Sequence, residues 1–247
     1  MARMTRTCFL IFLLACGVGF SLQAQDARPR PDHSAWDQLL QRHVRPDGMV
    51  DYRGFASDRA RLEAYIQEMS TFIPDSTWAR GRRLAFFINL YNALTVQLIV
   101  DNYPLKSIRH LARPWGRELI TLAGRAYSLD DIEHKVLRPM GEPRIHFAIN
   151  CASRSCPALQ PHAYTEEGLE AQLEAATSAF VNNPAHNRIT PRSASLSRLF
   201  SWYRSDFEEA AGSLTAFLNR YLDTPLEPDC RIRFLPYDWN LNQVPEP

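Results

Sequence analysis

Apolar residues recur at helical spacing in several long segments of this chain. Residues 33–44 and 58–71 each place their apolar side chains on one face, as an amphipathic helix does. Residues 80–103 are apolar on all sides, which predicts a buried central helix. Pro74 and Pro104 follow the second and third segments and end them, because proline cannot continue a helix.

Polar residues at the starts of later segments indicate further helices. Ser128 and Asp131 have the spacing of a capping box, which predicts a helix through His134 to Leu137. Amphipathic spacing and polar caps predict three more helices, over residues 165–182, around FSWYRSDF and over residues 213–221.

Short segments rich in β-branched and aromatic residues predict strands between the helices. ELITL and RAY flank Ala123-Gly124, a two-residue turn typical of a hairpin. A strand through IHFAIN, from Ile145, would place His146 and Cys151 on opposite faces. The other predicted strands are MVDY, RIT, SASL and the start of RIRFLPYDWNLN. The fold class is therefore predicted as α+β: a helix-rich single domain with a buried central helix packed on a small, mainly antiparallel sheet.

Two asparagines interrupt the apolar surface of the predicted central helix. Asn89 and Asn92 fall close together on a helical wheel, so both amides face one neighbour. A buried amide without hydrogen bonds costs about 1–3 kcal/mol, so polar groups should lie opposite them. Two interpretations stay open: the amides hold irregular backbone in place, or they orient a functional site.

The N-terminus has the pattern of a secretory signal peptide over residues 1–24. Arg3 and Arg6 precede an apolar segment, and the small residue Ala24 marks the cleavage point. The apolar segment spans about half of the roughly 20 residues that a transmembrane helix needs. We therefore predict an exported protein, periplasmic or extracellular, without a transmembrane segment.

Cleavage after the signal peptide would leave a flexible lead-in over residues 25–34 and one globular domain over residues 35–247. An alternative is a lipoprotein, in which residues 13–16 form a lipid-attachment box and Cys16 carries a membrane anchor. The apolar residues that follow Cys16 favour cleavage after Ala24 instead.

Composition and charge exclude several classes of function. The chain has 247 residues, of which 45% are apolar, and this suits one substantial core. Loss of residues 1–24 would change the formal charge from +1 to −1, and the remaining arginines are scattered, so nucleic-acid binding is not expected. The sequence has no glycine-rich phosphate loop, no G-x-S-x-G elbow and no H-E-x-x-H pair. No cofactor is predicted.

Three cysteines, Cys151, Cys156 and Cys230, follow the predicted signal peptide. A cysteine nucleophile needs a base that favours the thiolate, and His134 is the nearest candidate for Cys151 by sequence order. Metal binding by His146, Cys151, Cys156 and His162 is disfavoured by their loose spacing, so no metal is predicted. Disulfides between Cys151 and Cys156 or between Cys156 and Cys230 remain open, as does burial of small apolar thiols.

Five sequence blocks, in a fixed order along the chain, resemble those of a known family. They are LAFFINLYNAL, SLDDIEHKVLRP, PRIHFAINCASRSCPAL, LFSWYRSDF and YDWNLN. Together they resemble the domain-of-unknown-function 547 family, in an exported bacterial-type member, from about Trp36 to Asn242. Phe87 stands where the family typically has tryptophan. The resemblance implies no activity, but it marks many polar positions in these blocks, among them Tyr91, Glu133, Arg138 and Tyr237.

Three functions from different classes are compatible with these residues. One is a thiol-dependent hydrolase or acyl-transfer enzyme, with catalytic residues Cys151, His134, Asp206 or Asp238, and Asn89 or Asn92. Another is a non-catalytic module that binds a small molecule or a peptide. The third is a structural domain with a buried polar network. The residues predicted to bind or line a site are His146, Ser153, Ser155, Cys156, Tyr203, Trp239 and Asn242.

Overall fold

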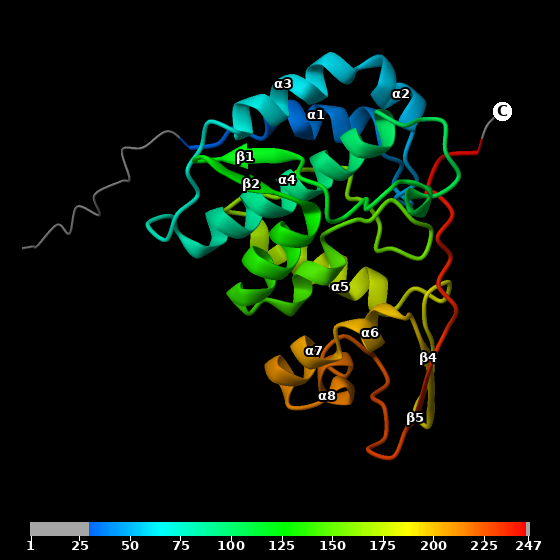
Figure 1. Ribbon diagram of the computed structural model, residues 1–247. Helices are drawn as coiled ribbons and strands as arrows, with labels where there is room; N and C mark the ends of the chain where they lie inside the picture. Colours follow the sequence, from blue (N-terminus) through cyan, green and yellow to red (C-terminus); the bar gives the residue numbers. More distant parts are fainter. Residues whose placement is uncertain (1–29, 246–247) are drawn as a thin grey trace, which may run out of the picture. The chain divides into compact units, whose positions relative to one another are not determined.

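The computed structural model describes residues 30–245, and the chain from Pro31 onward forms one compact unit (Figure 1). The predicted signal peptide and the alternative anchor at Cys16 lie outside the described residues. The fold is α+β, as predicted from the sequence: helices dominate, and the described strands form two small, mostly antiparallel sheets.

The first three helices pack together beside the central one. They are α1 (Ser34–His43), α2 (Tyr52–Ser57) and α3 (Arg59–Met69), and α4 is Arg80–Val100. The helices predicted over residues 33–44, 58–71 and 80–103 are thereby confirmed.

The strand predicted at MVDY is wrong for most of its length. Val50 makes isolated β-bridges to Val44 and Gln243, but Tyr52 already belongs to α2. The side chain of Asp51 accepts a hydrogen bond from the backbone N–H of Gly54 and so caps that helix.

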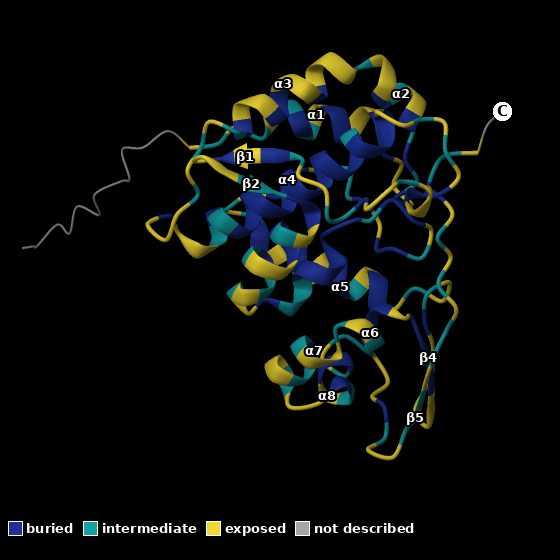
Figure 2. Ribbon diagram, viewed as in Figure 1, coloured by how far each residue is buried: buried dark blue, intermediate teal, exposed yellow. Residues whose placement is uncertain are grey.

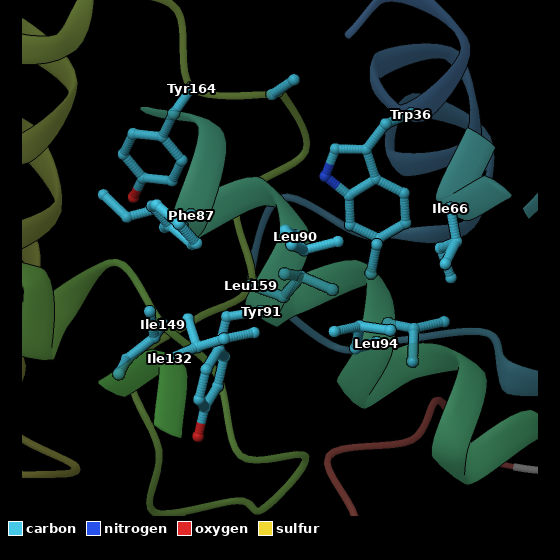
Figure 3. Packing of buried hydrophobic residues seen from close by; sticks show 14 of the residues in the cluster. Trp36, Ile66, Phe87, Leu90, Tyr91, Leu94, Ile132, Ile149, Leu159 and Tyr164 are labelled. Carbon is cyan, nitrogen blue, oxygen red and sulfur yellow. The ribbon is translucent and has the colours of Figure 1, made fainter. Parts of the chain in front are cut away.

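Helix α4 lies in the main hydrophobic core, which the burial colours of Figure 2 show clearly. In Figure 3, Trp36 and Ile66 lie on one side of it, while Tyr91 extends towards Ile132 and Ile149 on another. Among the described residues, α4 alone is long and apolar enough to cross a membrane by length and composition, and 89% of its apolar window is buried. Its apolar surface is therefore accounted for by the core around it.

A hairpin and three short helical segments follow α4. β1 (Ile120–Leu122) and β2 (Arg125–Tyr127) pair in antiparallel, and Ala123 and Gly124 form the turn with φ values of 48° and 78°, which confirms the hairpin. Next come the π-helix η2 (Asp131–Leu137) and the 3₁₀ helices η3 (Arg138–Met140) and η4 (Pro143–Phe147). The capping box before η2 is present, because the backbone N–H and hydroxyl of Ser128 both donate to Asp131.

The strand predicted at IHFAIN is wrong, because residues Pro143–Phe147 form η4. Pro143 fixes a helix-compatible φ at the first position, and the side chain of Glu142 accepts from the backbone N–H of Arg144. The expected placement of His146 and Cys151 on opposite faces of a strand therefore does not apply.

A second core surrounds Phe147. The elements that carry it are α5 (Leu169–Val181), β3 (Arg188–Thr190), β4 (Ser193–Leu196), α6 (Leu199–Trp202), α7 (Arg204–Ala211), α8 (Leu214–Leu218) and β5 (Arg231–Phe234). β3 pairs with β4 in antiparallel and β4 with β5 in parallel. Between the cores, η4 contributes Phe147 to one and Ile145 to the other.

The two buried asparagines of α4 hold irregular backbone in place. The amide of Asn89 donates to the carbonyl of Tyr164 and accepts from its N–H, at 2.7 and 2.9 Å. The amide of Asn92 donates to the carbonyl of Ala148 and accepts from the N–H of Asn150, at 2.9 and 2.8 Å. Asn92 thus supplies hydrogen bonds to main-chain groups of Ala148 and Asn150, as a neighbouring strand would do in a sheet.

Replacement of Asn92 by leucine is expected to lower the free energy of unfolding by about 2 kcal/mol, because buried main-chain groups at Ala148 and Asn150 lose their partners. Urea unfolding of the variant and the wild type measures this difference. Gln97→Leu is the matched control, since Gln97 is a half-buried amide on the same helix. Equal losses in both variants would contradict the role given to Asn92.

Candidate functional site

A cavity of about 220 Å³ lies where η2, η4, the cysteine loop and the C-terminal segment meet. Its polar lining includes Glu133 on η2, His146 on η4 and Cys151 on the loop that follows. Its aromatic lining consists of Tyr91, Trp115, Trp202, Tyr203, Tyr237 and Trp239. This volume suits a small molecule or a single side chain.

His146 is held at the cavity by Asp206. Its Nε2 lies 2.9 Å from Asp206 Oδ2, and its ring stacks on Tyr203 with centroids 3.7 Å apart. Arg138 donates two hydrogen bonds to Asp206, of 2.7 and 2.8 Å. Burial alone would raise the pKa of Asp206, but the hydrogen bonds from Arg138 and His146 outweigh it and hold that pKa well below 3.8.

The charge of Asp206 determines which nitrogen of His146 carries the proton. An ionised carboxylate can only accept, so Nε2 donates and the neutral ring has its lone pair on Nδ1. Burial lowers the pKa of His146 below 6.5, although the bond to Asp206 opposes this, and the ring is therefore neutral at pH 7. Nδ1 is buried without a hydrogen-bond partner, 4.0 Å from Oε1 of Glu133.

Cys151 is a thiol surrounded by hydrogen-bonding groups. Its Sγ lies 3.2 Å from the Ser153 hydroxyl and 3.3 Å from the Tyr237 hydroxyl. Its own backbone N–H donates to Sγ of Cys156 at 3.0 Å. A separate hydrogen bond between the two cysteine side chains lowers the pKa of Cys151 most. Burial opposes this effect, the hydrogen bonds with Ser153 and Tyr237 add to it, and the pKa of Cys151 is about 7. Burial instead raises the pKa of Cys156 well above 9.0.

The loop that carries Cys151 is held by hydrogen bonds within the loop and by contacts with the C-terminal segment. Asn150 accepts a hydrogen bond from the N–H of Ala152, whose φ is 60°, and donates to the carbonyl of Pro157. The hydroxyl of Ser155 accepts from the N–H of Asp238 at 2.8 Å, and Ser153 forms a β-bridge with Leu241. The C-terminal segment thus positions the loop and brings Tyr237 to Cys151.

Several predicted catalytic residues take other roles in the structure. Asn89 and Asn92 use their amides on the main chain and do not line the cavity, so the geometry does not support them as oxyanion donors. Asp238 accepts two hydrogen bonds from Asn240 through its side chain, and within residues 30–245 no histidine forms an ion pair with it.

Asp206 contacts His146 instead of His134, the base expected from sequence order. His134 does line the cavity, but its side chain is 41% exposed and its Nδ1 lies 3.3 Å from a nitrogen of Arg138.

Of the predicted binding residues, His146, Cys156, Tyr203 and Trp239 line the cavity. Ser153 reaches it through Cys151, whereas Ser155 and Asn242 hold backbone and buried side chains elsewhere. Prediction from local sequence patterns missed Trp115 and Trp202. Trp202 is an aromatic residue that is 45% exposed, and exposure of this kind cannot be read from a sequence.

The cysteines and histidines do not assemble into the other sites considered. Cys151, Cys156 and Cys230 are all free thiols. His162 lies beside Asp37, 3.3 Å away, and does not join His146 and the cysteines. Within residues 30–245, no group of three or more histidine, cysteine or acidic side chains is placed to hold a metal ion.

The fold and the cavity define a helix-rich α+β protein with a half-buried cysteine and an oriented histidine at one site. The family model described as "Protein of unknown function, DUF547" matches residues 76–181 of the chain. The match contains three of the five sequence blocks, with Glu133, His146 and Cys151, whereas Asp206 and Tyr237 lie beyond it. No curated protein and no solved structure matches the chain.

Proposed function

We propose that this protein is a thiol-dependent hydrolase or acyl-transfer enzyme, with Cys151 as nucleophile and His146 as general base. The observation that carries the proposal is a thiol with a pKa of about 7 that shares a small cavity with a neutral, carboxylate-oriented imidazole. His146 replaces His134 in this role because its free nitrogen is buried at the cavity and its ring is held by Asp206.

In the proposed reaction, the Cys151 proton passes to Nδ1 of His146, directly or through a water molecule in the cavity. The Sγ–carbon bond then forms at the substrate carbonyl, whose oxygen takes the displaced electron pair. The carbonyl reforms as the leaving group departs with the proton from His146. Water or another acceptor next attacks the thioester and gives its proton to His146. The acyl group departs on that acceptor, and the released thiolate takes the proton back from His146, which restores the starting state.

Asp206 supports the protonated state of His146 that forms during this cycle. Its carboxylate accepts the Nε2 proton and lies beside the positive charge that develops on the ring. Tyr237 and Ser153, which contact Sγ in the free protein, are the hydroxyl donors nearest to the oxyanion that would form there. We assign both as candidate oxyanion donors.

Export is part of the proposal, because the N-terminal pattern favours cleavage after Ala24. Intact mass of the protein from its native compartment tests this. The mass of a chain that begins at Gln25 would support a released protein. The mass of a chain that begins at Cys16 and carries two or three acyl groups would support the lipoprotein alternative.

An activated ester tests the catalytic assignment without knowledge of the natural substrate. Incubation with p-nitrophenyl acetate should place an acetyl group on Cys151, located by peptide mass spectrometry, and Cys151→Ser should lose it. His146→Asn should slow acetylation about 100-fold or more, whereas His134→Asn, the matched control, should retain it. Acetylation confined to Cys230, or equal losses in both histidine variants, would contradict the proposal.

A further inference from the structure

Two buried acceptor atoms, on two residues that line the cavity, lie close together without hydrogen-bond partners. They are Nδ1 of His146, which carries a lone pair, and Oε1 of Glu133, 4.0 Å away. His146 is 1% exposed and Glu133 is 6% exposed. The other carboxylate oxygen of Glu133 accepts from the Tyr91 hydroxyl at 3.4 Å. Buried polar atoms are usually paired, and a donor group between these two acceptors would satisfy both.

A nitrogen placed between two acceptors at this separation lies within about 2.9 Å of both, the normal length of an N–H···O or N–H···N bond. A primary ammonium group has three hydrogens and can donate to both acceptors at once. A carboxylate or a fully ionised phosphate ester has no donor hydrogen and would meet the Glu133 carboxylate as a like charge.

The charge of the lining favours a cation independently of these two atoms. Among the described residues that line the cavity, Asp130 and Glu133 are acidic and none is lysine or arginine. Arg138, which lies beside the cavity residue Tyr203, is already paired with Asp206. Burial and then the charge of Glu133 raise the pKa of Tyr203, which is another residue of the lining.

Aromatic rings complete a surface suited to a cation. Trp202 lies at the cavity, 45% exposed, with its ring centroid 4.8 Å from that of Tyr237 and 5.8 Å from that of Trp239. Ring faces attract ammonium groups through the quadrupole of the π-system. One of these rings already does so within the chain, since the guanidinium of Arg109 lies 5.3 Å from the centroid of Trp239.

We propose that the cavity binds the primary ammonium group of an amine that serves as the acyl acceptor, with Glu133 and Nδ1 of His146 as hydrogen-bond acceptors and the aromatic residues as its walls. Nδ1 is available to the amine in the acyl-enzyme, because the leaving group has by then taken the Cys151 proton. The inference rests on the proposed function in that it names the substrate class of the same site. The cavity volume of about 220 Å³ fits an amine of side-chain size, such as the end of a lysine side chain.

Tryptophan fluorescence of the Cys151→Ser variant, titrated with n-butylammonium chloride, tests the inference without any chemistry at the thiol. Saturable binding is expected, and n-butanol and butyrate at the same ionic strength should bind at least tenfold more weakly. Glu133→Gln should weaken n-butylammonium binding about tenfold or more. Glu118→Gln is the matched control, because Glu118 is exposed, lies outside the cavity and changes the net charge equally.

The outcomes separate this inference from the proposed function. If n-butylammonium does not bind, or binds equally well to Glu133→Gln, the inference is wrong and water is the donor between the two acceptors. Acetylation of Cys151 in the wild type would still support the enzyme in that case. If n-butylammonium binds as expected and no acetyl-enzyme forms, the inference holds and the site belongs to a non-catalytic amine-binding module.

Discussion

Replacement of Asp206 by asparagine is expected to lower the free energy of unfolding by about 3 kcal/mol and to slow acetylation of Cys151 at least 100-fold. Asp206 accepts two hydrogen bonds from Arg138 and one from His146, so the substitution leaves a partly buried guanidinium without its counter-charge. The asparagine amide can also donate to Nε2, which would move the ring proton of His146 to Nδ1 and remove the base.

The same variant should change how stability depends on pH. The pKa of Asp206 is lower in the folded protein than its ordinary value of 3.8. The stabilisation it contributes is therefore complete above that value and is lost as the pH falls towards the folded-state pKa. We expect the free energy of unfolding, measured in urea between pH 7 and pH 3, to fall less for Asp206→Asn than for the wild type as the pH is lowered.

Glu208→Gln provides the control on the same helix. Glu208 pairs with Arg204 on the exposed side of α7, and surface pairs of this kind contribute about 0–1 kcal/mol. A loss from Asp206→Asn no larger than that of Glu208→Gln would show that the Arg138–Asp206–His146 arrangement does not stabilise the fold. Unchanged acetylation in Asp206→Asn would remove Asp206 from the proposed mechanism.

Local sequence patterns predicted the elements whose formation depends on local chemistry. The hairpin turn at Ala123-Gly124, the capping box at Ser128 and the apolar helix α4 are all encoded within a few residues. The segment IHFAIN failed because a short apolar run fits a strand and a buried helical turn equally well. The choice between strand and helical turn depends partly on a residue far away in the sequence, because Asn92 holds the backbone that follows η4.

The candidate site was predictable only in part, because long-range packing assembles it. The sequence indicated Cys151, and the family blocks marked His146, Asp206 and Tyr237. The pairing was not predictable: His146 and Asp206 lie 60 positions apart, and Cys151 and Tyr237 lie 86 apart. Sequence order favoured His134 as the base. In the structure, α7 packs against η4, and this contact brings the carboxylate of Asp206 to His146.

Cys151 is expected to react with iodoacetamide with an apparent pKa of about 7. At pH 7 about half of such a thiol is ionised, compared with about 1% of a thiol at the ordinary value of 9.0. Alkylation of the folded protein between pH 5 and 10, followed for each cysteine by mass spectrometry, gives the profile. Cys151 should therefore be labelled at neutral pH, while Cys156, whose pKa burial raises, should stay unlabelled.

Variants of the groups around Sγ test the cause of the shift. Cys156→Ala and Tyr237→Phe should each raise the apparent pKa of Cys151, and Cys156→Ala should raise it more because that hydrogen bond lowers it most. Cys230 is the internal reference, since its pKa is raised and its alkylation should become fast only at alkaline pH. A Cys151 that reacts only above pH 9, or only after denaturation, would leave the protein without an activated nucleophile, and amine binding would then be the remaining function of the cavity.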